Sequence, residues 1–250
     1  MDERVFTAPR FRAVIFDFNG VVADDETPHL LCFQQALAEH GLSLTKDEYY
    51  GAYLGMDERA CAAALLAIRH GSSDPALLHA ILQRKARLFR ECTAQHKPQF
   101  FPGVIEFVKQ AGRCACLAIA SGGRREQIDY ALSGTPIERD FAVIVSADDI
   151  AIGKPDPAIY EFTLKLINGA MPRPPLITAA QCLVIEDSRA GVRSARAAGM
   201  RVVALATTYP ADQLAEADLV LSTLEGVTVT QIQESLSSTP TRDPDLAGDP

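Results

Sequence analysis

Short runs of apolar residues recur along the chain, and each has the length of a buried strand. The first lies within residues 11–18 and ends at Asp17. The later runs occupy residues 115–120, 142–145, 182–185, 202–205 and, more weakly, 219–221. Segments with helical spacing, such as residues 104–111 and 190–198, separate these runs. Because continuous apolar strands that alternate with helices are typical of sheets covered on both faces, the pattern predicts an α/β fold with a doubly wound parallel sheet.

A long stretch after the first predicted strand departs from this alternation. Residues 24–97 carry helix-start signals and apolar residues at helical spacing. The helix-start signals are Thr27 before Pro28, a capping box from Thr45 to Glu48, Asp57, and Asp74 before Pro75. We therefore expect a core of residues 1–23 and 98–233, an all-helical insert at residues 24–97, and a disordered tail at residues 234–250, which are rich in Ser, Thr, Pro and Asp.

The composition limits the function more than the fold. The formal net charge of −8 argues against a nucleic-acid-binding protein, because such proteins cluster Lys and Arg. Residues 1–10 lack the apolar core of a signal peptide, and no apolar run approaches the roughly 18 residues that span a membrane. The six cysteines lack the spacing of a zinc site. We expect a cytoplasmic monomer or weak homodimer that binds a small molecule, and neither nucleic acid nor a membrane.

Reactive side chains follow the ends of four predicted strands. Asp17 ends the first strand, and Ser121 and Lys154 follow the second and third. Glu186 and Asp187 end the fourth strand. Because ligands of open parallel sheets bind beyond the carboxyl ends of the strands, these side chains should meet in one crevice. A carboxylate can accept phosphate as a nucleophile, Mg²⁺ binds hard oxygens, and a lysine offsets phosphoryl charge, so the set favours magnesium-dependent phosphotransfer.

Four segments of the chain, taken together, resemble the haloacid dehalogenase (HAD) superfamily, in the branch with a helical cap that includes beta-phosphoglucomutase and phosphoglycolate phosphatase. They read AVIFDFNGVVADDE, LAIASGG, IGKPDPAIY and CLVIEDSRAGVRSARAAGMRVVAL. The resemblance extends from Phe11 to about Leu224. It implies a HAD-like parallel core with an inserted helical cap. It also implies a magnesium-dependent phosphoric monoester hydrolase that acts on a small phosphorylated metabolite.

The resemblance implies a role for each matching residue. Asp17 would be the nucleophile that forms an aspartyl-phosphate. The implied magnesium ligands are Asp17, the main-chain carbonyl of Asn19, Glu186 and Asp187. The implied phosphate-binding groups are Ser121, the amide of Gly122, and Lys154. In the cap region, Asp24 would lie in the hinge and His29 would match a linker histidine that helps couple cap closure to catalysis.

Arg59 has two interpretations from the sequence alone. It lies on a predicted cap helix, where it could contact a second anionic group of the substrate. A solvated arginine on the face of a helix is the interpretation that the sequence favours.

One residue departs from the pattern of the superfamily. Its phosphatases and mutases carry a second Asp two residues after the nucleophile as general acid and base, and here that residue is Asn19. An amide cannot transfer a proton near neutral pH, and such transfer typically contributes about 10²–10⁴-fold to the rate. Three hypotheses remain open: a substrate with a good leaving group, such as an acyl or aryl phosphate; deamidation at Asn19-Gly20; or a proton supplied by Asp25, Glu26 or His29.

Two other functions remain as alternatives. A beta-phosphoglucomutase-like phosphotransferase ranks below a hydrolase, because mutases cycle phosphate with the acid/base group that Asn19 cannot replace. A phosphate-sensing or scaffold protein would form an aspartyl-phosphate that persists, since its hydrolysis also needs a base. The matching lysine, serine and metal-ligand positions favour the hydrolase.

Overall fold

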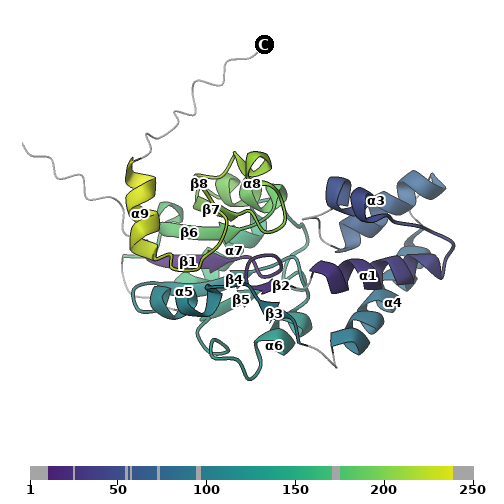
Figure 1. Cartoon of the computed structure of the whole chain (residues 1–250), viewed down its shortest axis with the longest axis horizontal. Coiled ribbons are helices and arrows are strands. Elements are labelled where there is room, and N and C mark those ends of the chain that lie inside the picture. Colours follow the sequence, from purple (N-terminus) through teal and green to yellow (C-terminus); the bar gives the residue numbers. More distant parts are fainter. Residues whose placement is uncertain are drawn as a thin grey trace, which may run out of the picture.

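A parallel six-stranded sheet forms the centre of the larger part of the molecule, in the order β5-β4-β1-β6-β7-β8 (Figure 1). The computed structural model describes residues 11–24, 26–53, 56, 58–71, 74–93, 97–170 and 175–238. The strands are β1 (Ala13–Phe16), β4 (Cys116–Ala120), β5 (Val143–Val145), β6 (Cys182–Glu186), β7 (Arg201–Leu205) and β8 (Leu219–Leu221). Each predicted apolar run is therefore a strand, with ends that differ by at most two residues. The predicted fold class is confirmed.

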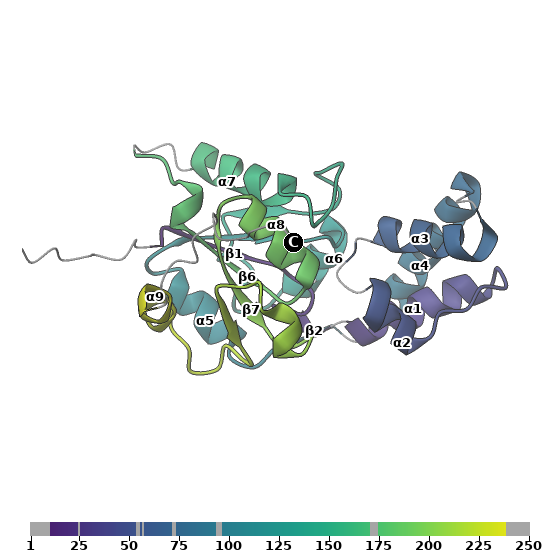
Figure 2. The same ribbon diagram turned by 90° about the horizontal axis from the view of Figure 1, so that it is seen from above.

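Helices cover both faces of this sheet (Figure 2). Alternate residues of β1 show the two faces: Val14 and Phe16 belong to one apolar cluster, and Ala13 and Ile15 belong to another. The first cluster includes residues of α5 (Val104–Ala111), α6 (Arg125–Leu132) and α9 (Val229–Ser238). The second includes residues of α7 (Ala158–Ala170) and α8 (Arg189–Ala197). Short 3-10 turns at η2 (Ala179–Gln181) and η3 (Ala211–Leu214) complete this part.

The segment between the first two strands of the sheet forms a separate helical layer beside it (Figure 1). Its helices are α1 (Glu26–Ala38), α2 (Lys46–Glu48), the π-helical turn η1 (Tyr49–Tyr53), α3 (Glu58–His70) and α4 (Pro75–Thr93). These helices bury an apolar core of their own, centred on Leu37, Leu66 and Ile81. We call this layer the cap.

Two short strands link the cap to the sheet. The strands β2 (Ala23–Asp24) and β3 (Gln99–Phe100) pair in antiparallel register, with Ala23 opposite Phe100. They lie where the chain enters and leaves the cap, so the two crossings are hydrogen-bonded to each other. The sequence did not predict this pair, because strands of two residues carry no periodic signal.

Among the described residues, the helix-start signals agree with the structure except at one position. The capping box from Thr45 to Glu48 is present, and the Asp74 carboxylate accepts a hydrogen bond from the Ala76 amide at 2.9 Å. Thr27 is not an N-cap, because α1 already begins at Glu26. Pro28 is tolerated there because the amides of the first helical turn have no partners inside the helix. Asp57 lies outside the described residues.

The predicted tail begins too early in the sequence. Helix α9 extends through Ser238, and Val229, Ile232 and Leu236 are buried in the core cluster of the sheet. Their spacing of three and four residues places one face of the helix against the sheet layer. The polar composition of this region masked that periodicity. Residues 239–250 lie outside the described residues.

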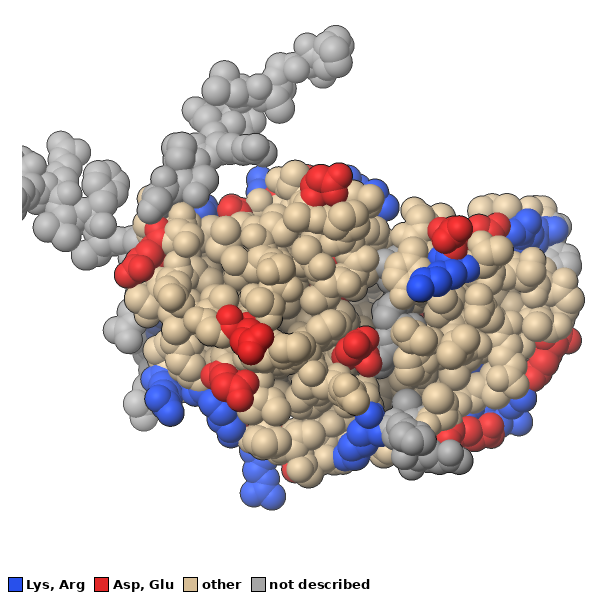
Figure 3. All heavy atoms as spheres, viewed as in Figure 1, with Lys and Arg blue, Asp and Glu red and all other residues tan. Residues whose placement is uncertain are grey.

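The surface carries no strong charge feature on the face shown in Figure 3. Lys and Arg side chains lie apart there, and several are next to acidic ones. Most of this face is neither acidic nor basic. Within the described part of the chain, no helix is both long and apolar enough to cross a membrane.

Candidate active site

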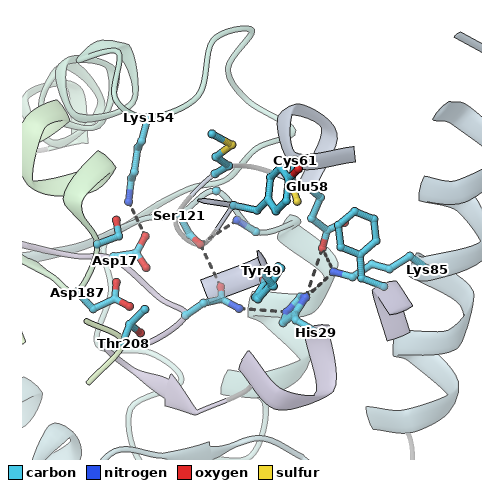
Figure 4. A pocket seen from close by; sticks show the side chains of 17 residues that line it. Asp17, His29, Tyr49, Glu58, Cys61, Lys85, Ser121, Lys154, Asp187 and Thr208 are labelled. Atoms are coloured by element: carbon cyan, nitrogen blue, oxygen red, sulfur yellow. Dashed lines mark hydrogen bonds and ion pairs between the residues drawn. The ribbon is translucent and has the colours of Figure 1, made fainter. Parts of the chain in front are cut away.

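A pocket lies between the carboxyl ends of the central strands and the cap (Figure 4). From the core it is lined by Asp17, Asn19, Ser121, Gly122, Gly123, Lys154, Asp187, Ser188 and Thr208. From the cap it is lined by His29, Phe33, Tyr49, Tyr53, Met56, Glu58, Cys61 and Lys85. The structure thus brings together all but three of the residues for which the resemblance or the cap helix suggested a catalytic, phosphate-binding, metal-binding or cap role. Of the three, Glu186 lies behind the pocket wall, Arg59 lines a neighbouring pocket, and Asp24 is exposed in β2.

Asp17 and Lys154 form the centre of the core side of the pocket. Lys154 Nζ donates hydrogen bonds to Asp17 Oδ1 at 2.5 Å, to Glu186 Oε1 at 2.7 Å and to the Ala120 carbonyl at 3.0 Å. Burial raises the pKa of Asp17 to about 7, although Lys154 opposes this rise. Burial also disfavours a charged lysine, but Asp17 and Glu186 outweigh it and hold the pKa of Lys154 well above its usual value. A buried ammonium group is therefore fixed beside the carboxylate at the end of β1.

Glu186 supports Lys154 and does not face the pocket. Its Oε1 accepts from Lys154 and from the Tyr160 hydroxyl, the latter at 2.9 Å. Its Oε2 accepts from the Asp187 amide and from the amide and hydroxyl of Ser188. The role of Glu186 as a magnesium ligand, which the resemblance implied, stays a prediction, and both of its oxygens accept hydrogen bonds from donors of the chain. The close approach of α8 explains this, because a Cβ atom at Gly191 would meet the Glu186 carboxylate.

The remaining carboxylates fit a divalent cation in the pocket. Asp17 and Asp187 lie next to each other on the side where Lys154 and Thr208 are found (Figure 4). Gly20, at φ +78°, makes room for Asp187, because a Cβ atom there would lie 1.9 Å from Asp187 Oδ2. No cluster of three or more His, Cys, Asp or Glu residues in the described ranges is arranged as a metal site. A magnesium ion would therefore rely on two carboxylates and on main-chain or phosphate oxygens, which suit its chemistry.

Asn19 connects the core side of the pocket to the cap side. Its Oδ1 accepts a hydrogen bond from the Ser121 hydroxyl at 3.4 Å, and its Nδ2 lies 3.1 Å from His29 Nε2. On the other side of the ring, Lys85 Nζ lies 2.5 Å from His29 Nδ1. Both partner nitrogens are donors, but a neutral imidazole has only one acceptor nitrogen, so the two ring nitrogens of His29 cannot both accept. Half a turn of the Asn19 amide would present its oxygen to an Nε2–H group.

The cap contributes a buried cluster of His29, Lys85 and Glu58. Lys85 donates a short hydrogen bond to Glu58 Oε1, and His29 Nδ1 lies 3.4 Å from the same oxygen. The His29 ring stacks on Phe89 with 4.0 Å between the ring centroids. Burial alone would raise the pKa of Glu58, but Lys85 and His29 outweigh it and hold this pKa below its usual range. Glu58 therefore stays ionised, and its charge balances that of Lys85.

The sequence interpretation missed Lys85, Glu58 and Tyr160. Lys85 had a detectable signal, because it follows Ile81 by four residues and so interrupts the apolar face of α4 with a charge. Tyr160 had none, since its hydroxyl reaches Glu186 only through the packing of α7 against the sheet.

Known proteins similar to this chain agree with its fold. A family model of haloacid dehalogenase-like hydrolases matches residues 14–205. The CbbY protein of Rhodobacter capsulatus is 33% identical over 232 residues, covering 89% of this chain and 98% of that protein. A phosphorylated carbohydrates phosphatase of Thermotoga maritima is 29% identical over 192 residues, covering 75% and 82%. A crystal structure of a CbbY mutant from Rhodobacter sphaeroides with xylulose-(1,5)bisphosphate has a TM-score of 0.75 and 25% identity, covering 88% and 98%.

These similarities span both the sheet and the cap. They include the pocket residues at the ends of β1, β4 and β6, since the carboxyl ends of all three strands lie inside the matched range. This chain belongs to the haloacid dehalogenase-like hydrolase family.

Proposed function

We propose that the protein is a magnesium-dependent phosphohydrolase that acts on a small phosphorylated metabolite through an aspartyl-phosphate on Asp17. The observation that supports it most strongly is the buried pair of Asp17 and Lys154 at the pocket. The names of its relatives, among them a phosphorylated carbohydrates phosphatase and a validoxylamine A 7'-phosphate phosphatase, point to the same class of substrate.

The residues of the chain divide the reaction into two displacements. In the first, an Asp17 oxygen bonds to phosphorus while the bond to the leaving oxygen breaks. In the second, water attacks the phosphorus and frees Asp17. Lys154, the Ser121 hydroxyl and the Gly122 amide hold the phosphoryl oxygens by charge and hydrogen bonding. Asp17, Asp187 and the Asn19 carbonyl would hold Mg²⁺, which would supply the remaining counter-charge.

His29 is the proposed source of the proton that Asn19 cannot supply. Its Nε2 lies at the Asn19 side chain, and Lys85 contacts its Nδ1. As the leaving oxygen takes a proton from Nε2, Lys85 can give one to Nδ1. When water attacks in the second step, its proton passes to Nε2 and the Nδ1 proton returns to Lys85. Asp25 and the side chain of Glu26, the other two candidates, lie outside the described residues.

A phosphate-release assay tests this function. The protein is freed of metal with a chelator, resupplied with Mg²⁺ and given a panel of phosphate monoesters. We expect release from the parent with Mg²⁺, and loss of release in Asp17→Asn. Asp129→Asn is the matched control, because Asp129 is exposed and pairs with Arg125 on α6. Undiminished release by Asp17→Asn, or no release by the parent from any ester, would refute the proposal.

Asn19 favours a phosphate-sensing protein as the second candidate. In that case Asp17 would take up phosphate from a reactive donor and keep it. Incubation of the protein with acetyl phosphate and Mg²⁺ separates the two functions. Labelling of Asp17 to one equivalent without further phosphate release identifies the sensor, and continued release identifies the hydrolase.

A further inference from the structure

The positive charges that line the pocket are already balanced by carboxylates. Lys154 pairs with Asp17 and Glu186, and Lys85 pairs with Glu58. Both lysine side chains are buried, with 7% and 3% of their surface exposed, so the ammonium groups of these pairs are shielded from water. Residues 54–57, between η1 and α3 in the sequence, include no Lys or Arg. Among the described lining residues, the cap wall that faces the phosphate site therefore has no net positive charge.

The rest of the cap wall is aromatic and apolar. It consists of Phe33, Tyr49, Tyr53, Met56 and Cys61. Tyr49 and Tyr50 meet edge to face, with 5.7 Å between their ring centroids, and so stiffen this side. Aromatic walls of this kind suit the C–H face of a ring, while polar tips such as a tyrosine hydroxyl suit its hydroxyl groups.

We infer that the substrate is a monophosphate whose remaining part is uncharged and carries a ring with an apolar face, such as a sugar or cyclitol. This rests on the proposed function. A second phosphate would have to leave water beside the Glu58 carboxylate without a cation to receive it, which is unfavourable. Glu58 is thus the specificity-determining residue, because it cancels the charge of Lys85. The inference separates this chain from the CbbY crystal structure that holds a bisphosphate.

The neighbouring pocket is the alternative site at which a second phosphate could bind. It shares Glu58, Gly122 and Lys154 with the first pocket and adds Arg59 and Arg124. Arg124 lies 3.6 Å from Asp148, and both side chains are more than two-fifths exposed. Arg59 is exposed at the start of α3. Solvated arginines at this rim are weak competitors for a second phosphate compared with a buried cation.

A binding experiment tests the inference without requiring turnover. The Asp17→Asn protein, with Mg²⁺ present, is titrated by calorimetry with glucose 6-phosphate and with glucose 1,6-bisphosphate. We expect the monophosphate to bind at least about tenfold more tightly. Adding Glu58→Gln leaves the Lys85 charge without its counter-charge. The ratio of the two dissociation constants should then shift in favour of the bisphosphate by about tenfold or more. Equal or tighter binding of the bisphosphate to the Asp17→Asn protein overturns the inference.

Matched variants decide the remaining outcomes. Glu39→Gln removes the same charge from a surface pair with Arg84, next to Lys85 in the sequence, and should leave the ratio unchanged. If Glu58→Gln fails to fold, the double variant Glu58→Gln/Lys85→Met is used in its place. Because this variant removes both charges, the inference requires it to have the same ratio of dissociation constants as the protein that retains Glu58 and Lys85. A folded Glu58→Gln protein with an unchanged ratio overturns the inference. So does a bisphosphate preference that Arg59→Gln abolishes, because the second phosphate then binds in the neighbouring pocket.

Failure of the inference and failure of the proposed function give different results. The inference concerns only the ratio of two dissociation constants, measured in a protein that lacks the nucleophile. The proposed function concerns phosphate release by the parent. Release together with a bisphosphate preference overturns the inference alone, and a monophosphate preference without release refutes the proposed function alone.

Discussion

Asn19 stands at the position where the resemblance to the superfamily predicts a proton-transferring carboxylic acid. Its amide contacts Ser121 on one side and His29 on the other. The Asn19 side chain therefore connects two residues of the pocket, but its amide cannot transfer a proton. If His29 supplies the proton, its loss should matter most where the leaving group is a poor one.

His29→Asn should slow alkyl phosphates far more than aryl phosphates. We expect the rate for an alkyl ester to fall about 10²-fold, a typical share of acid catalysis, and the rate for 4-nitrophenyl phosphate to fall by less than about tenfold. Adding Asn19→Asp to this variant should recover much of the alkyl activity, because a carboxylic acid returns to the pocket. His40→Asn, an exposed histidine after α1, is the control. An equal loss on both esters would show that His29 only positions other groups.

Gly20→Ala should disturb the pocket through one added carbon atom. The new Cβ would lie 1.9 Å from Asp187 Oδ2, at a backbone angle of φ +78°. Gly41 has φ +71°, and a Cβ atom added there would meet nothing within 4 Å, so Gly41→Ala reports the backbone cost alone. That cost is about 1–2 kcal/mol in the free energy of unfolding. We expect Gly20→Ala to lose phosphate release and to be less stable than Gly41→Ala, and similar behaviour of the two variants would argue against a required Asp187 position.

Strands were easier to predict than the residues that complete the pocket. The runs that form β1, β4 and β6 are buried on both faces, so each reads as continuous apolar sequence. Their carboxyl ends meet at one edge of the sheet, which is why Asp17, Ser121 and Asp187 could be grouped from the sequence alone. The contact between Glu186 and Tyr160 depends on how α7 packs, and that information is absent from local spacing.

At the end of the chain, the average composition led to a wrong prediction. Polar residues predicted a tail from residue 234, yet α9 continues to Ser238 and its apolar face is buried. A rule based on average polarity cannot see one buried residue per turn. Lys85 was overlooked for a related reason, since a single charge within the apolar face of α4 changes the average very little.

Ile232→Ala tests the packing of α9 directly. Ile232 is 1% exposed in the core cluster, so truncation should lower the free energy of unfolding by about 2–5 kcal/mol. Thr230→Ala is the control, because Thr230 is exposed on the same helix. Chemical denaturation of both variants gives the comparison. A loss below about 0.5 kcal/mol for Ile232→Ala would mean that α9 does not support the sheet.

The pocket draws its walls from two layers with separate apolar cores. The sheet supplies Asp17, Lys154 and Asp187, and the cap supplies His29, Glu58 and Lys85. The paired crossings β2 and β3 and the pocket itself join the two layers. Ligands that occupy the pocket should therefore stabilise the molecule as one unit.

Mg²⁺ should raise the thermal unfolding temperature of the protein. At about 100 times its dissociation constant, a ligand specific to the folded state adds about 2.7 kcal/mol, which corresponds to several degrees for a chain of this size. Asp187→Asn should abolish most of this shift because it removes a proposed ligand. Asp129→Asn, remote from the pocket, should keep it. A full shift in Asp187→Asn would place the bound ion elsewhere.

The bridge made by Asn19 has a consequence for timing. The Asn19 side-chain amide contacts Ser121, the proposed phosphate-binding serine, and His29 in the first helix of the cap, so it cannot turn toward one without altering its contact with the other. Binding of an anion at Ser121 and packing of α1 against the core would therefore both depend on the side-chain torsion of Asn19. This coupling would let binding of the phosphoryl group precede contact between the cap and the rest of the ligand.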